Sequence, residues 1–228
     1  MAKQKIYQFY AELNDFKPKI WRRFQVSADT KISKFAYIVM IMFRMRALHL
    51  FCIEHNGPIL TPKGRKSNRL KLLDRYELPN EYSLDENGSK DATSSTISQF
   101  AFNENAFLVL WYDFGDDWFV TIKLEEIIED NQSLKSDFPK ILEGKCYGIV
   151  DDCGGVWGLE DLVEAFKQKS GDLYDDLSDW LETEDFDIKK FDLPEMNLHI
   201  KNIPKIYEKI YEKRLNLTRK EVSLISLF

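Results

Sequence analysis

The chain has few cysteines, few histidines and no long apolar run. Its three cysteines, Cys52, Cys146 and Cys153, form an odd set without any Cys-x-x-Cys pair, as expected for reduced thiols. The longest apolar run has nine residues, from Phe35 to Phe43, whereas a membrane-spanning helix needs about 20. The N-terminus carries no apolar signal core. We therefore expect a cytoplasmic protein without a membrane partner.

Familiar catalytic and cofactor motifs are also missing. The sequence contains no Gly-x-Gly-x-x-Gly fingerprint, no Walker-type phosphate loop and no Gly-x-Ser-x-Gly elbow. Nucleophilic catalysis by Cys153 would need a nearby base, and none of the three histidines is close to it in sequence. These absences favour a buried structural thiol at Cys153. From these absences we expect no cofactor, and we assign no catalytic residue. An enzyme is therefore the less favoured class.

What the chain does have is an apolar composition and an uneven charge. Its 228 residues are 44% hydrophobic and 14% aromatic, which is typical of a globular domain. The net charge is −6, but residues 151–199 carry 15 acidic and 4 basic side chains (4 − 15 = −11). Residues 201–228 carry 7 basic and 3 acidic side chains (7 − 3 = +4). Such an asymmetry indicates either that the basic tail packs near the acidic segment or that it binds something acidic outside the chain, and we favour the first because the two segments are adjacent.

Alternating and helical patterns predict an α+β fold with a mainly antiparallel sheet built from hairpins and packed against helices. The tail forms a C-terminal helical segment. We divide the chain into a domain over 1–200, with a long connection at about 61–98, and a basic helix over 201–228 that packs on or extends it. The predicted strands cover residues 5–13, 20–26, 50–55, 106–112 and 118–124. The predicted helices cover residues 32–45, 67–76, 159–169 and 172–182, with another beginning at 204.

Four local details accompany these elements. Asp29 and Thr30 are suitable caps for the helix at 32–45. Asn56-Gly-Pro58 is expected to end the strand at 50–55. In the turn between the last two strands, Gly115 is expected to adopt a positive φ. The helix at 172–182 is expected to turn its leucines and Trp180 inward.

The most informative motifs are Trp111-Tyr-Asp-Phe-Gly-Asp-Asp-Trp118 and, about thirty residues later, Asp151-Asp-Cys-Gly-Gly155. Together with Pro18-Lys-Ile-Trp-Arg-Arg23, His49-Leu-Phe51 and Phe138-Pro139, they occur in the order found in the plasmid pRiA ORF-three-like family. The sequence resembles this family, also described as the TnpR-type passenger protein of insertion elements, over roughly residues 5–200. The resemblance implies a compact α+β protein associated with plasmids and mobile elements, and it implies no established reaction.

The chain departs from the family pattern at several positions. Val120 stands where the family commonly has a histidine, and Ile149-Val-Asp151 replaces the usual Pro-Pro-Glu before the second motif. These departures weaken the case for a polar active site and favour a binding surface that the family shares. The first hypothesis is therefore a non-enzymatic binding module for an unknown protein or peptide partner. Its expected surface consists of His49, Asp113, Asp116, Trp118, Glu125, Asp151, Asp152, Cys153 and Trp157.

Two alternatives remain open for the same residues. The carboxylates with His49 and Cys153 could converge on a divalent metal in an enzyme acting on nucleic acid or phosphoesters. No close His/Cys spacing of the zinc-module kind supports that, and our prediction is no metal. The competing structural interpretation is that the aspartates accept main-chain N–H bonds in tight turns, as Asp readily does.

A DNA-associated accessory role is the third hypothesis. Basic residues that could contact phosphates gather in one loop and again in the tail. The overall pI near 5.3 opposes this hypothesis, so nucleic acid is possible but not favoured. The loop residues are Lys63, Arg65, Lys66 and Arg69.

Overall fold

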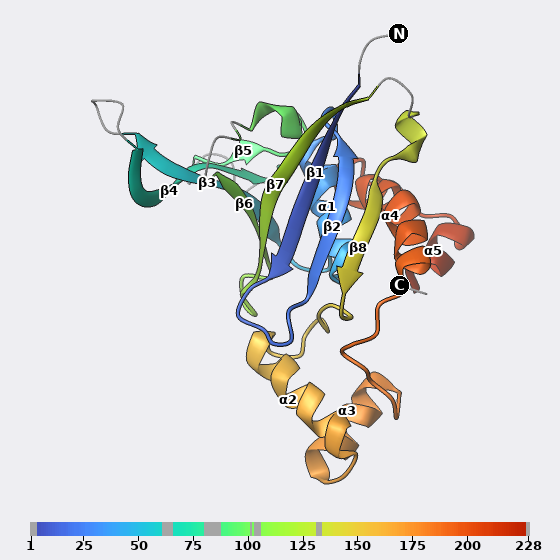
Figure 1. Ribbon diagram of the computed structural model, residues 1–228. Helices are drawn as coiled ribbons and strands as arrows, with labels where there is room; N and C mark the ends of the chain where they lie inside the picture. Colours follow the sequence, from blue (N-terminus) through green and yellow to red (C-terminus); the bar gives the residue numbers. More distant parts are fainter. Residues whose placement is uncertain are drawn as a thin grey trace.

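The computed structural model describes residues 4–60, 66–79, 88–100, 102, 106–130 and 134–226. Within them an eight-stranded sheet has the order β5-β4-β3-β6-β7-β1-β2-β8, and helices pack on one face and at one end of it (Figure 1). All neighbouring strands are antiparallel except β4 and β5, which are parallel. This confirms the predicted α+β class with a mainly antiparallel sheet. No helix in the described part is both long enough and apolar enough to cross a bilayer.

Strands dominate the first two thirds of the chain, and helices dominate the last third. The strands are β1 Gln4–Leu13, β2 Trp21–Ser27, β3 Phe51–Leu60, β4 Lys66–Glu77, β5 Lys90–Asp91, β6 Phe107–Tyr112, β7 Trp118–Asp130 and β8 Lys140–Lys145. The helices are α1 Ile32–Met42, α2 Gly155–Gln168, α3 Asp172–Leu181, α4 Leu193–Tyr207 and α5 Arg219–Ser226. A π-helical turn, Glu208–Glu212, continues α4.

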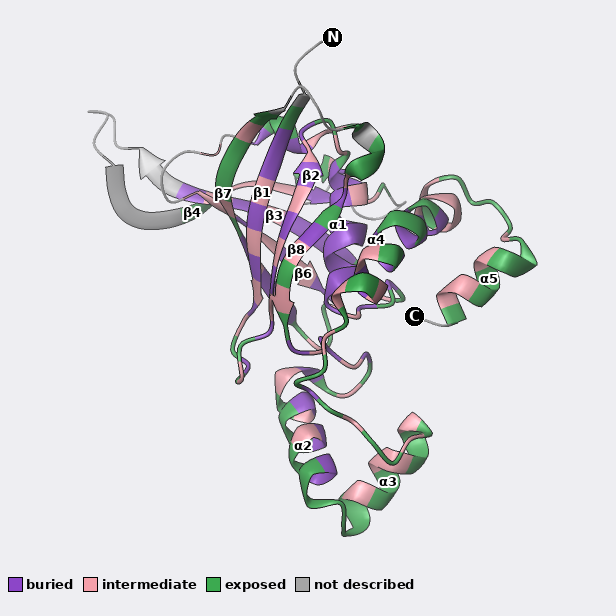
Figure 2. Cartoon of the chain, turned by 45° about the vertical axis from the view of Figure 1, so that its right-hand side comes forward, coloured by how far each residue is buried: buried purple, intermediate pink, exposed green. Residues whose placement is uncertain are grey.

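The core lies between the sheet and α1. The inward residues of β1 and β2 alternate as the sequence predicts, and Phe9 and Phe24 stack on each other with ring centroids 5.6 Å apart. Helix α1 is apolar almost all round, and every residue of it except Lys34 is buried (Figure 2). Helix α4 covers α1 from outside, with the ring of Tyr207 at 5.7 Å from that of Tyr37. These layers hold the ends of β6 and β7, where the family motif begins.

Several local predictions are wrong. Helix α1 begins after Lys31, whose side chain makes no cap, and neither Asp29 nor Thr30 is the N-cap residue. Strand β3 does not end at 56–58, because it continues to Leu60 in register with β4. The segment predicted as a helix at 67–76 is strand β4. Its Arg, Lys and Leu residues suit a helix, but main-chain pairing with β3 overrides that local preference.

The C-terminal helices also differ from expectation. Helix α4 begins at Leu193, because the Asp192 carboxylate accepts the N–H of Glu195 at 2.9 Å and Pro194 occupies the first turn. Pro204 therefore lies inside this helix. Helix α4 runs across residue 200, where we place the domain boundary, and that boundary stays a prediction.

The α2–α3 hairpin extends from one end of the sheet, away from α4 and α5 (Figure 1). Helix α3 has no fully buried residue: Leu177 and Leu181 are half-buried, whereas Leu173 and Trp180 are exposed, contrary to expectation. The two helices pack against each other through Phe166 and Tyr174, whose ring centroids are 5.4 Å apart. The basic tail packs on α1 and α4 instead of on this acidic hairpin, contrary to prediction.

Candidate functional site

The first family motif forms the tight turn between β6 and β7. Asp113 has a φ of 53°, and its Oδ1 accepts the N–H groups of Gly115 at 3.0 Å and Asp116 at 3.4 Å. The N–H of Asp117, which has a φ of 56°, donates to the Asp113 carbonyl at 2.7 Å. The two aspartates, and not Gly115, therefore hold the left-handed conformations. Asp tolerates this conformation because its short side chain bonds locally to the main chain.

The second family motif lies directly against that turn. The N–H of Gly154 donates to Asp116 Oδ2 at 3.2 Å. Gly155 has a φ of 73°, and a Cβ there would lie 2.5 Å from the carbonyl oxygen of Asp116. A side chain at either position would be strained, and at Gly155 it would also collide with the main chain. The glycines of the second motif thus allow the two loops to touch.

His49 connects the two loops from a third segment of the chain. Its Nδ1 lies 3.4 Å from Asp113 Oδ2, and its Nε2 lies 3.0 Å from Asp152 Oδ1. One potential ligand atom from each of these three residues lies within 4.8 Å of the others. The His49 ring also meets the edge of Tyr112, with centroids 5.8 Å apart. We call His49, Asp113 and Asp152 the loop junction.

Asp151, beside the junction, is a buried structural carboxylate. Its side chain is only 2% exposed, and its Oδ2 accepts the N–H of Arg46 at 2.8 Å. Burial raises the pKa of Asp151, although the bond from Arg46 and the neighbouring Tyr112 hydroxyl oppose the rise. Asp151 also lines a cavity of about 550 Å³ with Arg44, Arg46 and Trp180.

Cys153 is a thiol and not a thiolate at neutral pH. Burial, with the charge of Asp116 adding to it, raises the pKa of Cys153 to about 12. Its sulfur lies 3.6 Å from the carbonyl oxygen of Gly155. The thiolate that a cysteine nucleophile requires is therefore disfavoured here.

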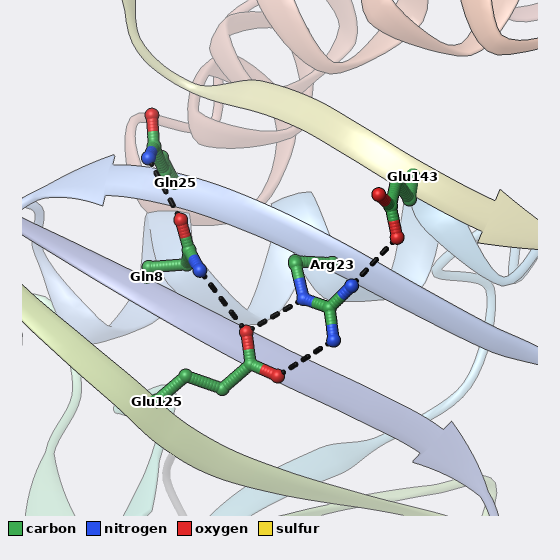
Figure 3. Close-up of polar contacts among 5 residues, drawn as sticks. All are labelled: Gln8, Arg23, Gln25, Glu125 and Glu143. Carbon is green, nitrogen blue, oxygen red and sulfur yellow. Dashed lines mark hydrogen bonds and ion pairs between the residues drawn. The ribbon is translucent and has the colours of Figure 1, made fainter.

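Two residues assigned to the binding surface from the sequence lie elsewhere. Trp118 is fully buried, because it points to the core side of β7, and it cannot contribute to a surface. Glu125 lies on the opposite, outer face of the sheet, where Arg23 binds it through two nitrogens at 2.7 and 2.9 Å (Figure 3). Gln8 donates to the same carboxylate at 3.1 Å, so Glu125 belongs to a polar network of the sheet.

Trp157, in contrast, is 79% exposed on the first turn of α2. Leu48 and Leu50, on either side of His49, are 61% and 63% exposed, and Phe114 is exposed beside Asp113. Apolar side chains therefore flank the loop junction along all three segments that form it.

The proposed nucleic-acid contacts cannot be placed. Lys63 and Arg65 lie outside the described residues. Lys66 and Arg69 belong to β4, but their side chains are also outside the described part.

Arg22 is a key residue that the motif hypotheses missed. It is fully buried, and all five of its N–H groups donate to main-chain carbonyls. Its guanidinium also lies 5.2 Å from the ring centroid of Phe43 and 4.2 Å from that of Phe191. The five acceptors, at 2.7–2.8 Å, belong to Trp21, Met42, Lys145, Cys146 and Tyr147.

The sequence contained a signal for this role. Arg22 occupies an inward position of an alternating strand, between Ile20 and Phe24. Burial lowers the pKa of Arg22 to about 9, which still leaves it protonated at neutral pH. Gly144 makes room for it, because a Cβ there would lie 2.8 Å from Arg22 Cδ. The Arg-Arg pair of the motif thus has one inward structural member and one outward member, Arg23.

Comparison with known proteins agrees with these motifs. Residues 5–195 match the model of the plasmid pRiA4b ORF-3-like protein family. The chain belongs to this family. The two sequence motifs that this plasmid pRiA4b ORF-3-like protein shares with its family thus form the two loops that meet at His49.

Two relatives of this family member extend the comparison. A crystal structure of a protein of unknown function, MM3350 from Methanosarcina mazei Go1, is similar with a TM-score of 0.68 and 26% identity, covering 85% of this chain and 98% of that one. The uncharacterized protein y4hQ of Sinorhizobium fredii (strain NBRC 101917 / NGR234) is 27% identical over 86 residues. That match spans 38% of this chain and 43% of y4hQ. These likenesses support the fold and the kinship, and they name no reaction.

Proposed function

We propose that this chain is a cytoplasmic, non-enzymatic binding module of a mobile-element-associated, TnpR-passenger type, and that it binds a protein or peptide at the loop junction. The observation that carries this proposal is that three distant segments converge at His49, Asp113 and Asp152 while Trp157 stays 79% exposed next to them in sequence. Exposed aromatic side chains are frequent anchors of protein interfaces. The three free cysteines agree with a reducing compartment.

The chemistry of the junction suits recognition better than covalent catalysis. The pKa of Cys153 is raised, and Asp113 and Asp116 already accept main-chain N–H groups. The side chain of Asp152 is 53% exposed, and a basic group of a partner could reach it. Leu48, Leu50 and Phe114 offer apolar contact around that charge. We therefore expect the partner to present a cationic side chain flanked by apolar residues.

Binding of partners recovered from the native host tests the proposal. Each recovered protein is purified and its affinity measured for wild type, for a Leu50→Ala/Trp157→Ala variant and for a control. The control, Leu134→Ala/Leu198→Ala, removes equally exposed leucines from other surfaces. Truncation of interface anchors typically costs 1 kcal/mol or more each, so we expect at least about a tenfold loss only at the junction variant. Equal affinities for all three folded proteins would exclude this surface.

The convergence also favours a second candidate, a divalent-metal site at the same junction in an enzyme that acts on phosphoesters. One nitrogen and two carboxylate oxygens within 4.8 Å of one another are suitable ligand types for a transition metal. Thermal melting of the tag-free protein in Mn²⁺, in Zn²⁺ and in chelator tests this, with His49→Ala as the matched variant. A metal-dependent rise in Tm that disappears in His49→Ala supports the site. Identical melting in metal and chelator removes it.

A further inference from the structure

Helix α3 presents an acidic surface with apolar residues that stay largely exposed in the described part of the chain, although one of them, Trp180, also lines the cavity beside Arg44 and Arg46. Its four aspartates are all exposed, and it contains no basic residue. Leu173 and Trp180, two helical turns apart, are 53% and 47% exposed. Residues seven apart lie on the same face of a helix, so these two form one apolar stripe beside the aspartates. The aspartates are Asp172, Asp175, Asp176 and Asp179.

The C-terminal tail presents the complementary surface. Helix α5 has no buried residue, and Arg219 and Lys220 in its first turn are exposed together with Arg214 just before it. Leu215 and Val222 are 53% and 50% exposed among these charges. The tail thus combines positive charge with apolar side chains, as α3 combines negative charge with apolar side chains.

These two surfaces do not meet within one chain. Helix α5 packs beside α4, whereas the α2–α3 hairpin extends from the end of the sheet, away from it (Figures 1 and 2). The ion pairs of the tail within the described residues are internal to it. Lys209 binds Glu221 at 2.5 Å, and Lys213 binds Glu208 at 2.7 Å. The charge imbalance between residues 151–199 and 201–228 is therefore not compensated by contact between the described parts of these segments.

We propose that the acidic face of α3 binds the basic tail of a second copy of this chain. A second copy fits because its tail supplies positive charges for the aspartates of α3 and apolar side chains that can cover Leu173 and Trp180. If each tail binds the α3 of the other copy, the two contacts are equivalent and the assembly closes as a two-fold dimer. This inference does not depend on the loop junction being a binding site.

Solution mass as a function of salt gives the first measurement. Light scattering coupled to size exclusion should give twice the mass of one chain at about 50 mM salt. It should shift toward one chain at about 1 M salt, because the Debye length falls to about 3 Å. The low-salt measurement is repeated at protein concentrations up to about ten times higher. A mass of one chain at all of these concentrations would overturn the proposal.

Charge-reversal variants give the sharper test. Asp176→Lys/Asp179→Lys changes the net charge of α3 from −4 to 0 (2 − 2), and Arg219→Glu/Lys220→Glu changes that of α5 from +1 (2 − 1) to −3. Each variant alone then loses the net charge attraction between α3 and the tail in both contacts, so each is expected to be monomeric. An equimolar mixture restores opposite charges in both contacts, so it is expected to form a dimer containing one copy of each. The four substitutions combined in one chain should likewise restore a homodimer.

A matched control separates this specific pairing from net charge. Lys123→Glu/Lys140→Glu changes two exposed lysines of the sheet by the same total charge as the tail variant, and it should remain dimeric. Circular dichroism confirms that each variant is folded. Dimers of either single-surface variant, or a mixture that stays monomeric while both proteins are folded, would overturn the proposal.

Discussion

The Asp116 carboxylate accepts the main-chain N–H of Gly154 at 3.2 Å, and the carbonyl of Asp116 lies where a Cβ of Gly155 would have to be. Asp116 of the first family motif thus holds the main chain at Gly154 and leaves no room for a side chain at Gly155. The relationship explains why the motifs occur together: each loop is shaped by the main chain of the other. Substitutions on either side of this contact should therefore have distinct and measurable effects.

Gly155→Ala should destabilise the protein more than Gly154→Ala. Both glycines have positive φ values, 73° and 91°, where an alanine costs about 1–2 kcal/mol. Only at Gly155 would the new Cβ meet the Asp116 carbonyl at 2.5 Å, since nothing lies within 4 Å of a Cβ at Gly154. We expect a loss of about 2–4 kcal/mol at Gly155, measured by urea unfolding. Equal losses at the two positions would show that the close approach has no energetic weight.

Asp116→Ala should loosen the second loop without unfolding the domain. It removes the acceptor of the Gly154 N–H, a loss of about 0.5–1.5 kcal/mol. Hydrogen exchange measured residue by residue should show faster exchange at Gly154, while core amides of β1 and β7 stay unchanged. Asp116→Asn keeps a side-chain oxygen that can accept the bond, so it should exchange like the wild type. Fast exchange in both variants would mean that the carboxylate charge, and not the acceptor oxygen, holds the loop.

Arg22→Met should be among the most destabilising single substitutions. It deletes five donors from five buried or half-buried carbonyls and keeps a similar apolar volume between Phe43 and Phe191. We expect a loss of at least about 3 kcal/mol in equilibrium unfolding. The adjacent Arg23→Met is the matched control, because its ion pairs are near the surface and worth about 0–1 kcal/mol. Similar losses for the two arginines would contradict the structural role of Arg22.

Glu125 should stabilise the protein at neutral pH and lose that contribution in acid. The Arg23 guanidinium, and then Gln8, lower the pKa of Glu125 in the folded chain against the opposing effect of burial. A lowered folded pKa means that the contribution is fully present above the ordinary Glu pKa and is lost as pH falls through the lowered pKa of the folded chain. Wild type should therefore exceed Glu125→Gln by about 0.5–1 kcal/mol near pH 7. The difference should begin to shrink as pH falls toward about 4.5 and should vanish once the pH is below the lowered pKa of the folded chain.

The control for the pH series is Glu126→Gln, an exposed neighbour on the same strand. Urea unfolding from about pH 3 to about pH 7, across the ordinary Glu pKa, compares the three proteins. A Glu125→Gln difference that grows toward low pH would have the wrong sign and would contradict the ion pair with Arg23.

Local pattern was sufficient where one face of an element meets the core. The alternation in β1 and β2 predicted strands and their inward residues, because a period of two has only one buried face. The apolar runs at β6 and β7 predicted strands but not which residues point inward, since Trp118 was expected at the surface and is buried. Pattern failed at β4, where strand pairing overrides helix-forming residues, and at α3, where Leu173 and Trp180 were expected to point inward but are exposed. Gly115 was expected to take the positive φ because glycine is the usual choice, whereas side-chain bonding let Asp113 take it.

The sequence by itself determined the fold class and the family, since both depend on periodicity and on motifs that are local in the chain. Only the tertiary structure decided which motif residues meet. It brought His49, Asp113 and Asp152 together, buried Trp118, and moved Glu125 to the outer face beside Arg23. The physical reason is that a contact between loops depends on the register of strands far apart in sequence and on close main-chain approaches. Neither the identity of a residue nor its spacing along the chain specifies those distances.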